Sequence, residues 1–242
     1  MTEGVSTHPL LIVGTGNPHK VEEIATMLSD VAVEVRGSDV LPEVPDVDET
    51  GATFEANAAL KAIAFAKAAA VLRHSSGGRR IWVLSDDSGL CVDALDGRPG
   101  VHSARYAASN SNTNADSAAN NRKLVAELSN VADDLRSAHF VCVAALATVP
   151  RTTVQDSTET RPKVLFTVRG ECHGVIAREE RGTGGFGYDP LFVVPALGLT
   201  FAELPPQEKN RMSHRARALL ALREKLKDLV DSTVSSRRPP SS

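Results

Sequence analysis

The chain has few cysteines and no long hydrophobic segment. Its three cysteines, Cys91, Cys142 and Cys172, are odd in number, and none forms the CxxC pair of a zinc or redox motif. We therefore expect reduced, buried thiols and no zinc site. No apolar run approaches the length that spans a membrane, and the N-terminus lacks the basic and apolar segments of a secretory signal. These absences predict a cytoplasmic protein that does not bind membranes.

The chain also lacks an excess of positive charge. It contains 27 lysine and arginine residues against 30 aspartate and glutamate residues, which gives a formal net charge of -3. Nucleic-acid-binding proteins usually carry a basic surface, so we expect no nucleic-acid polymer as a partner. A small anionic ligand stays compatible with this charge, because a local site can be positive while the whole chain is not.

Alternating β-rich runs and helical patterns predict the fold class. Strands are expected over residues 10–13, 33–40, 81–85, 139–149, 163–170 and 171–178. Helices are expected over residues 20–28 and 54–72, after Asp116, and after Ser213. Thr53, Asp116 and Ser213 are expected to cap the second, third and last helices. Gly170 is expected to mark a turn between the last two strands of an antiparallel meander. The pattern predicts an α/β protein with a mixed β-sheet flanked by helices, and a cleft where strand ends meet helix starts.

The segment GTGNPHK, residues 14–20, follows a strand and opens a helix. Free N–H groups at a helix start suit a phosphate group, and Lys20 adds a full positive charge at the same end. Gly14 and Gly16 allow the backbone to approach a ligand closely. The segment is neither a P-loop, which ends in Gly-Lys-Ser/Thr, nor a dinucleotide fingerprint, which needs a third glycine. It predicts either a phosphate site or an ordinary strand-to-helix turn.

The segment DDSG, residues 86–89, places two carboxylates side by side where a strand-like run ends. Adjacent carboxylates repel, and a hard cation such as Mg²⁺ would relieve the repulsion. In extended backbone Asp86 and Asp87 point to opposite faces, so one can face a cleft while the other anchors the loop. The alternative is a solvated Asp-Asp turn that caps the next segment.

Two loops contain residues suited to a ligand. The loop PDVDETG carries Asp48 and Glu49, which fit either a second metal carboxylate or a solvated acidic loop. The segment RGTGGFGYDP combines four glycines with Phe186 and Tyr188. Such a segment suits a flat ligand that stacks on an aromatic ring, with Asp189 accepting from the ligand's ring N–H groups, or it is a glycine-rich hairpin.

Basic residues also open the last helix. The segment EKNRMSHRARAL places His214 and Arg215 in the first turn, where positive charge opposes the helix dipole. This placement indicates either donors aimed at an acceptor or a tolerated surface pair. No Ser-His-Asp order indicates a covalent nucleophile. A silent nucleotide-binding module remains a rival hypothesis, whereas the missing third glycine argues against a dinucleotide-dependent oxidoreductase.

Taken together, these segments resemble the inosine triphosphate pyrophosphatase family, also called Ham1-like. The segments that carry the resemblance are TGNPHKVEE, ETGATFEANAALKA, DDSGLCVDALDGRPGVHSARY, GTGGFGYDPLF and EKNRMSHRARAL, which occur in the family's order and span about residues 10–225. The segments RHSSGGRR and PRTTVQDSTETRPK go beyond the family pattern and are expected to be loop changes. The resemblance implies a Ham1-like domain over residues 9–230, between a flexible N-terminus (1–8) and a disordered tail (231–242).

The resemblance implies an activity and a shape. The activity is Mg²⁺-dependent hydrolysis of non-canonical purine nucleoside triphosphates (ITP, dITP and XTP) to the monophosphate and pyrophosphate, which cleanses the nucleotide pool. The shape is an elongated two-lobed single domain with the active site in the cleft between the lobes, and the assembly is a homodimer.

The resemblance also implies roles for individual residues. The triphosphate would be held by Thr15, Gly16, Asn17, Pro18, His19 and Lys20. Asp87 would be the catalytic carboxylate, as base or metal ligand, and Asp48 or Glu49 would be a further metal ligand. The rest of the substrate would be held by Ser88, Phe186, Gly187, Tyr188, Asp189, Lys209, His214 and Arg215. Asn57 and Lys61, four residues apart on one helical face, would reach phosphate. The sequence leaves open whether Asp86 or Asp87 acts as the base.

Overall fold

The structure is a computed structural model that describes residues 8–108, 114–150 and 161–235. Residues 1–7 of the expected flexible N-terminus and residues 236–242 of the expected tail lie outside this part of the chain, as do residues 151–160 of the long connection. The last helix extends to Ser235, so residues 231–235 are helical. No helix in the described residues is long and apolar enough to span a membrane.

One mixed sheet organises the described residues, with seven strands in the order β2-β1-β3-β4-β5-β6-β7. The strands are β1 (Leu10–Val13), β2 (Glu34–Gly37), β3 (Ile81–Val92), β4 (Ser137–Thr148), β5 (Val164–Ile176), β6 (Phe192–Val194) and β7 (Leu199–Thr200). The α-helices are α1 (Pro18–Met27), α2 (Phe54–Ala68), α3 (Ser117–Glu127), α4 (Pro206–Met212) and α5 (His214–Ser235). The 3-10 helices are η1 (Ser38–Val40), η2 (Ala69–His74), η3 (Asp93–Leu95), η4 (Gly100–Arg105) and η5 (Asp133–Leu135). The predicted class, a mixed sheet flanked by helices, is confirmed.

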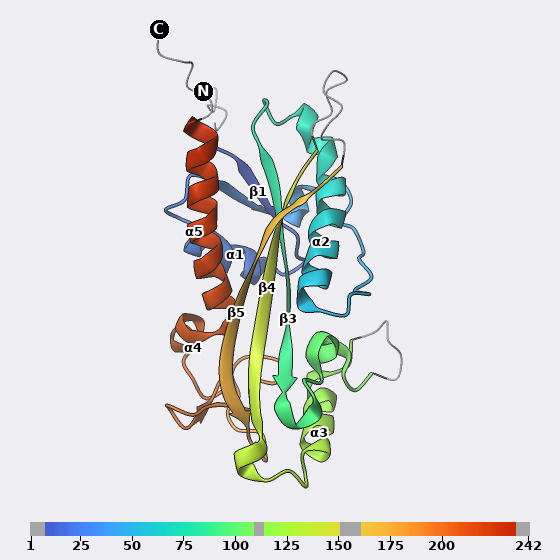
Figure 1. Cartoon of the computed structure of the whole chain (residues 1–242), viewed down its shortest axis with the longest axis vertical. Coiled ribbons are helices and arrows are strands. Elements are labelled where there is room, and N and C mark those ends of the chain that lie inside the picture. The colour runs from blue at the N-terminus through green and yellow to red at the C-terminus, as the bar shows by residue number, and fades with distance from the viewer. Residues whose placement is uncertain (1–7, 109–113, 151–160, 236–242) are drawn as a thin grey trace.

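Three long strands give the molecule its elongated shape (Figure 1). β3, β4 and β5 contain 12, 12 and 13 residues and pair antiparallel to one another, whereas β1 pairs parallel with β2 and β3. At a rise of about 3.3 Å per residue each long strand runs about 40 Å. The same strands therefore serve both ends of the molecule.

The strand that contains the paired aspartates does not end at them, contrary to the expectation from the sequence. β3 continues to Val92, and its pairing with β4 joins Asp86 to Ala144 and Asp87 to Val143. The backbone hydrogen bonds from β4 keep this polar segment extended, which local sequence preference alone does not require. The two carboxylates consequently lie in the middle of a strand, on opposite faces of the sheet.

The turn expected at Gly170 was also wrong, because β5 is one continuous strand through this residue. A Cβ atom at Gly170 would lie 2.2 Å from the backbone oxygen of His214 and 2.3 Å from the backbone nitrogen of Ala218. The glycine therefore allows the start of α5 to pack directly on the strand. Close approach of another backbone, rather than a turn, explains this glycine.

Helices cover both faces of the half of the sheet that contains β1 (Figure 1). Alternate residues of β1, β3 and β4 pack against α2, in a core of small and branched side chains that includes Ala58, Ala62 and Val83. The intervening residues pack against α1 and α5, with Leu84 and Leu222 fully or nearly fully buried. This alternation is the period-two pattern of a strand buried on both faces.

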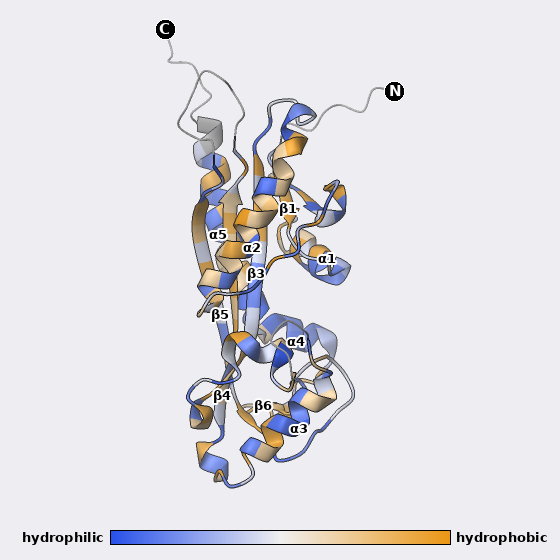
Figure 2. Cartoon of the chain, turned by 90° about the vertical axis from the view of Figure 1, so that its right-hand side faces the viewer, coloured by the Kyte–Doolittle hydropathy of each residue, from blue (hydrophilic) through white to orange (hydrophobic). Residues whose placement is uncertain are grey.

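A separate core fills the other half of the molecule. It contains the far ends of β3, β4 and β5 together with α3 and β6, and Phe140, Phe192 and Phe201 lie at its centre. Figure 2 shows α3, α4 and β6 gathered in this half, apart from α1 and α2. The molecule thus has two lobes built on shared strands.

The predicted caps of two helices are confirmed. The Thr53 hydroxyl accepts from the Ala56 amide at 3.1 Å, and the Ser213 hydroxyl accepts from the Ala216 amide at 3.1 Å. Asp116 occupies the cap position of α3 but its side chain makes no capping hydrogen bond there. The expected helix over residues 54–72 is α2, which passes into the tighter η2 after Ala68.

The cleft lies where β1 ends. The pairing of β1 with β3 stops at Val13 and Leu84, so the next residues of β3 have no strand beside them on that edge. α1 leaves β1 on one face of the sheet, and α2 enters β3 on the other. Such a switch point at the carboxyl ends of parallel strands is where α/β sheets bind ligands.

Substituting Gly170 tests the contact between α5 and β5. In Gly170→Ala we expect the free energy of unfolding to fall by about 3 kcal/mol, because the added methyl group overlaps the backbone of α5. The measurement is urea denaturation followed by circular dichroism. Gly16→Ala is the control, since its Cβ would meet no atom within 4 Å. An unchanged denaturation midpoint in Gly170→Ala would show that the helix does not rest on this glycine.

Candidate active site

Two cavities flank the middle of β3. The charged cavity, about 250 Å³, lies at the end of β1 and is lined by Gly14, Thr15, Gly16, Lys20, Pro45, Val47, Glu49, Lys61, Phe65 and Asp86. The aromatic cavity, about 300 Å³, lies in the other lobe and is lined mainly by residues from β3, η4, the 114–120 segment, the glycine-rich loop and the start of α5. Asp86 and Ser88 alternate along the same face of β3, and the Ser88 hydroxyl donates to the Asp86 carboxylate at 3.2 Å. The two cavities therefore meet at neighbouring residues.

The loop between β1 and α1 forms one wall of the charged cavity. A Cβ atom at Gly14 would lie 2.4 Å from the Ser85 hydroxyl oxygen and 2.8 Å from the Phe65 ring, so this position needs a glycine. The Asn17 side chain caps α1 by accepting from the His19 amide at 3.0 Å. Gly16, by contrast, has open space where a side chain would be. The His19 and Lys20 amides already donate to Asn17, so α1 contributes the positive end of its dipole and the Lys20 side chain beside an open surface.

Lys20 joins this loop to β3. Its ammonium group lies 3.0 and 2.9 Å from the two carboxylate oxygens of Asp86. Burial would raise the pKa of Asp86, but the nearby charges of Lys20 and Arg215 outweigh burial and hold that pKa well below its usual range. Asp86 is therefore ionised at neutral pH and fixes the lysine at the wall of the charged cavity.

Lys61 makes the matching contact on the opposite face. Its ammonium group lies 2.9 Å from an oxygen of Asp87 and 2.9 Å from an oxygen of Glu49. The amide of Asn57 donates to Asp87 at 3.2 Å and accepts from the Gly51 amide at 2.7 Å. The structure thus brings together Asn57 and Lys61 as predicted, but at a carboxylate.

Burial and charged neighbours balance differently at the two aspartates. At Asp87 burial outweighs the contact with Lys61 and raises the pKa, and the carboxylate of Glu49 raises it further. The pKa of Lys61 is raised, because its two carboxylate partners outweigh its own burial. Asp87 therefore binds a proton more readily than Asp86. This difference suits Asp86 for balancing the charge of Lys20 and Asp87 for accepting a proton.

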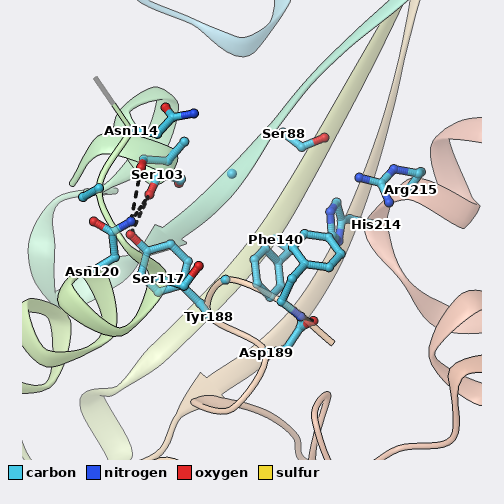
Figure 3. Close-up of a pocket in the computed structure, with 15 residues that line it drawn as sticks. Ser88, Ser103, Asn114, Ser117, Asn120, Phe140, Tyr188, Asp189, His214 and Arg215 are labelled. Carbon is cyan, nitrogen blue, oxygen red and sulfur yellow. Dashed lines mark hydrogen bonds between the residues drawn. The ribbon is translucent and has the colours of Figure 1, made fainter. Parts of the chain in front are cut away.

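The aromatic cavity has two opposed walls (Figure 3). Ser103, Asn114, Ser117 and Asn120 lie on one side, whereas His214 and Arg215 lie on the other. The ring of His214 stacks on Phe140 with centroids 4.9 Å apart. Nδ1 of His214 and Nε of Arg215 are buried, and among the residues that the structure describes they have no hydrogen-bond partner. This wall therefore offers polar atoms that a ligand can satisfy.

Several predicted ligand residues use their polar groups within the protein. The Tyr188 hydroxyl donates to the Ser103 carbonyl at 2.8 Å. Asp189 accepts from the Phe186 amide at 2.7 Å and pairs with Lys209, whose ammonium lies 4.7 Å from the centre of the Phe186 ring. Tyr188 and Asp189 line the aromatic cavity, but their polar groups bind other parts of the protein and so fix the shape of its wall. Phe186 is 65% exposed, so its ring leaves a surface on which a flat ligand can stack.

Several predicted residues line neither cavity. The side chain of His19 is 92% exposed and pairs with Glu22 at 3.8 Å, and Asp48 is exposed. Of the predicted loop residues, Thr15, Gly16 and Lys20 line the charged cavity, whereas Asn17 and Pro18 do not. Asp87 and Lys209 contact the cavity-lining residues Lys61 and Asp189.

The sequence analysis missed the wall that η4 and the start of α3 provide. Asn120 is buried, donates to the carbonyls of Ser103 and Ala104 at 3.4 and 3.2 Å, and accepts from the Ala107 amide at 2.7 Å. Arg105 follows on the same 3-10 helix and contacts Glu49. The sequence predicts only a helix after Asp116 here, and the asparagine content of this helix start is the signal that could have indicated the wall.

A magnesium ion shared with a ligand fits the carboxylates of Glu49, which lines the charged cavity, and of Asp87, which contacts Lys61 in that lining. Glu49 and Asp87 supply hard carboxylate oxygens, and both already bind one cation, the Lys61 ammonium. Within the described residues, no group of three or more His, Cys, Asp or Glu side chains could hold a metal ion. Mg²⁺ commonly binds through one or two carboxylates and completes its shell with phosphate oxygens and water. The carboxylates of Glu49 and Asp87 therefore fit this mode of Mg²⁺ binding.

Comparison with known proteins identifies relatives along most of the chain. The sequence matches the Ham1 family over residues 11–225. It is 44% identical to a dITP/XTP pyrophosphatase of Geobacillus kaustophilus over 222 residues, which is 91% of this chain and 95% of that protein. A dITP/XTP pyrophosphatase of Geobacter sulfurreducens is 44% identical over 216 residues, 89% of this chain and 96% of that protein.

Solved structures agree with this comparison. A HAM1 protein from Coxiella burnetii superposes with a TM-score of 0.73 at 38% identity, covering 90% of this chain and 98% of that chain. A nucleoside-triphosphatase described as a dITP/XTP pyrophosphatase, from Mycobacterium abscessus, superposes with a TM-score of 0.64 at 39% identity, covering 88% of this chain and 98% of that chain.

His214 is expected to give the free energy of unfolding a pH dependence. Burial, with Arg215 and Lys209 nearby, lowers the pKa of His214 from 6.5 to about 3. The unfolded chain takes up a proton below about pH 6.5 while the folded protein does not. The stability from the neutral ring is therefore complete above about pH 6.5 and is lost as the pH falls toward about 3.

Urea denaturation at two pH values measures this effect. Between about pH 7.5 and about pH 5 the protonation of His214 in the unfolded chain should remove about 2 kcal/mol from the free energy of unfolding. His214→Gln, which carries no titrating group, should lose correspondingly less over the same interval. Equal losses in both proteins would contradict a neutral, buried imidazole.

Proposed function

The chain belongs to the Ham1 family, and we propose that it hydrolyses non-canonical purine nucleoside triphosphates, dITP, XTP and ITP, to the monophosphate and pyrophosphate. The products form when water attacks the α-phosphorus and the bond from that atom to the bridging oxygen breaks. Pyrophosphate leaves with the bonding electrons. This activity would remove non-canonical purine nucleotides from the nucleotide pool.

The observation that carries the proposal is the meeting of three helix starts at the middle of β3. The first turns of α1 and α5 supply Lys20 to the charged cavity and His214 to the aromatic cavity, and the first turn of α2 supplies Asn57, which donates to Asp87. The start of a helix carries a partial positive charge. A triphosphate in the charged cavity and a nucleoside in the aromatic cavity would therefore bind as one molecule.

Two lysines and the α1 loop suit the triphosphate. Lys20 and Lys61 line the charged cavity from opposite sides, and Thr15 and Gly16 complete its wall. Positive charge at both sides neutralises the phosphates and the charge that builds up on the leaving pyrophosphate. These side chains are held in advance by Asp86 and Asp87, so little reorganisation is needed when substrate binds.

Asp87 is the residue we assign to the attacking water. Its carboxylate is held by Asn57 and Lys61 on the α2 side of β3, and it would orient the water and accept its proton. Asp86 instead accepts from the Lys20 ammonium through both carboxylate oxygens and holds that lysine where it would bind substrate. When bound by Glu49 and Asp87 together with phosphate oxygens, Mg²⁺ would supply further neutralisation of the triphosphate charge.

The aromatic cavity suits a base with a 6-oxo group. Arg215 Nε–H is a buried donor without a partner, and His214 offers a second donor in the tautomer that carries its proton on Nδ1. A 6-oxo group accepts from such donors, whereas the amino group of adenine would leave them unpaired. The exposed ring of Phe186 provides a face on which the base can stack.

The family resemblance supports two further proposals. We propose that the protein acts as a homodimer, and that it acts in the cytoplasm, where its substrates are found. A nucleotide-binding module without activity is the alternative, and the fixed Asp87–Lys61–Glu49 cluster favours the enzyme.

A nucleotide panel tests the proposed activity. We expect pyrophosphate release from XTP, dITP and ITP with kcat/KM at least about tenfold above that for ATP, because the unmatched donors reject adenine. A chelator should abolish release, and excess Mg²⁺ should restore it. Release of orthophosphate in place of pyrophosphate, or equal rates on ATP, would contradict the proposal.

Replacing Asp87 tests its assigned role. Asp87→Asn keeps the shape of the side chain but cannot take a proton, so kcat should fall about 10²- to 10⁴-fold. Asp133→Asn, an exposed carboxylate outside both cavities, is the matched control and should keep wild-type kcat. Circular dichroism should show that both variants are folded. Full turnover by folded Asp87→Asn would remove this residue from the chemistry.

A further inference from the structure

Arg105 connects the walls of the two cavities. It is the last residue of η4, directly after Ser103 and Ala104, which line the aromatic cavity. Its guanidinium group reaches the other lobe, where Nη2 donates to the backbone carbonyl of Glu49 at 3.1 Å. Nη1 lies 3.9 Å from the Glu49 carboxylate. One side chain therefore touches both the backbone and the carboxylate of a residue at the charged cavity.

The 3-10 helix η4, which carries Arg105 beside the aromatic cavity, is held by several hydrogen bonds. The Ser103 hydroxyl accepts from the Leu90 amide at 2.8 Å and donates to the Gly100 carbonyl at 2.6 Å. The Ser103 carbonyl accepts from Tyr188 at 2.8 Å and from Asn120 at 3.4 Å. These bonds tie η4 to β3, to α3 and to the glycine-rich loop, so Arg105 projects from a rigid base.

The segment that Arg105 contacts has little regular structure of its own. Residues 41–53 run between η1 and α2 without a helix or strand. The Gly51 amide donates to the side chain of Asn57 at 2.7 Å, and Lys61 holds the Glu49 carboxylate. Such a segment depends on side-chain contacts from neighbouring elements to fix its position.

We propose that Arg105 is a positioning residue that fixes Glu49 beside Lys61 and Asp87 and ties that placement to the wall of the base-binding cavity. The proposal rests on the proposed function, because Glu49 then faces the triphosphate and its metal ion. Arg105 acts on the reaction through Glu49 and does not itself contact the substrate.

An arginine suits this task better than a lysine. The planar guanidinium group presents several N–H donors in a fixed fork, so one side chain can contact a carbonyl and a carboxylate together. A lysine at the same position can reach one of these acceptors but has no fork. The side chain of Arg105 is only 19% exposed, which limits competition from water.

Hydrogen exchange in the protein without nucleotide tests the positioning directly. In Arg105→Ala the amides of residues 41–53 should exchange at least about tenfold faster, because the loop loses a hydrogen bond from a charged donor. Arg105→Lys should give an intermediate rate. Arg178→Ala, which removes an exposed arginine paired with Asp133 at 2.7 Å, should leave this segment unchanged. Unchanged exchange of residues 41–53 in Arg105→Ala would overturn the proposal.

Kinetics with XTP or dITP then test the route of action. Arg105→Ala should lower kcat about tenfold with KM within about twofold, and should weaken Mn²⁺ binding measured by electron paramagnetic resonance in the presence of pyrophosphate. In a Glu49→Gln background the same substitution should lower kcat by less than about twofold. A full tenfold loss in that background, or a rise in KM alone, would show that Arg105 acts directly on the substrate.

The two experiments separate this proposal from the proposed function. If the wild-type protein releases no pyrophosphate from any nucleotide, the proposed function fails, and the exchange rates still decide whether Arg105 positions Glu49. If the wild type is active but Arg105→Ala keeps wild-type kcat and Mn²⁺ binding, only the positioning proposal fails.

Discussion

Two ammonium–carboxylate pairs, Lys20–Asp86 and Lys61–Asp87, organise the centre of the molecule. The side chains of an extended strand alternate between faces, so the neighbouring carboxylates of β3 each meet a different layer of helices. Each lysine offsets the cost of burying its aspartate and in return is held at the edge of the charged cavity. Two adjacent aspartates would repel each other at a turn. Here each aspartate binds its own lysine, and both lysines line the charged cavity.

The position of these pairs follows from the unequal lengths of the strands. β1 stops opposite Leu84, whereas β3 continues with β4 as its partner to Val92. The edge that β1 leaves open gives a ligand access to the middle of the sheet, and the helices that begin there direct the positive ends of their dipoles toward it. Access, positive potential and buried carboxylates therefore coincide at one place without any insertion into the fold.

Close backbone contacts and cross-lobe hydrogen bonds hold the two halves in register. Gly170 lets α5 lie directly on β5, which places His214 and Arg215 at the wall of the aromatic cavity. Arg105 reaches from that half of the molecule to Glu49 in the other. Because both lobes share β3, β4 and β5, residues of the two cavity walls lie only two positions apart at Asp86 and Ser88.

The sequence by itself determined the alternating elements, the caps at Thr53 and Ser213, and which residue types could bind phosphate, metal and base. Hydrogen bonds within one helical turn depend on spacing along the chain, so local pattern was enough to predict them. Only the tertiary structure decided that Asp86 and Asp87 lie mid-strand, because that depends on β4 as a partner. It also decided that Arg105 reaches Glu49, 56 residues away, since contacts between distant segments are set by packing and leave no periodic signal in the sequence.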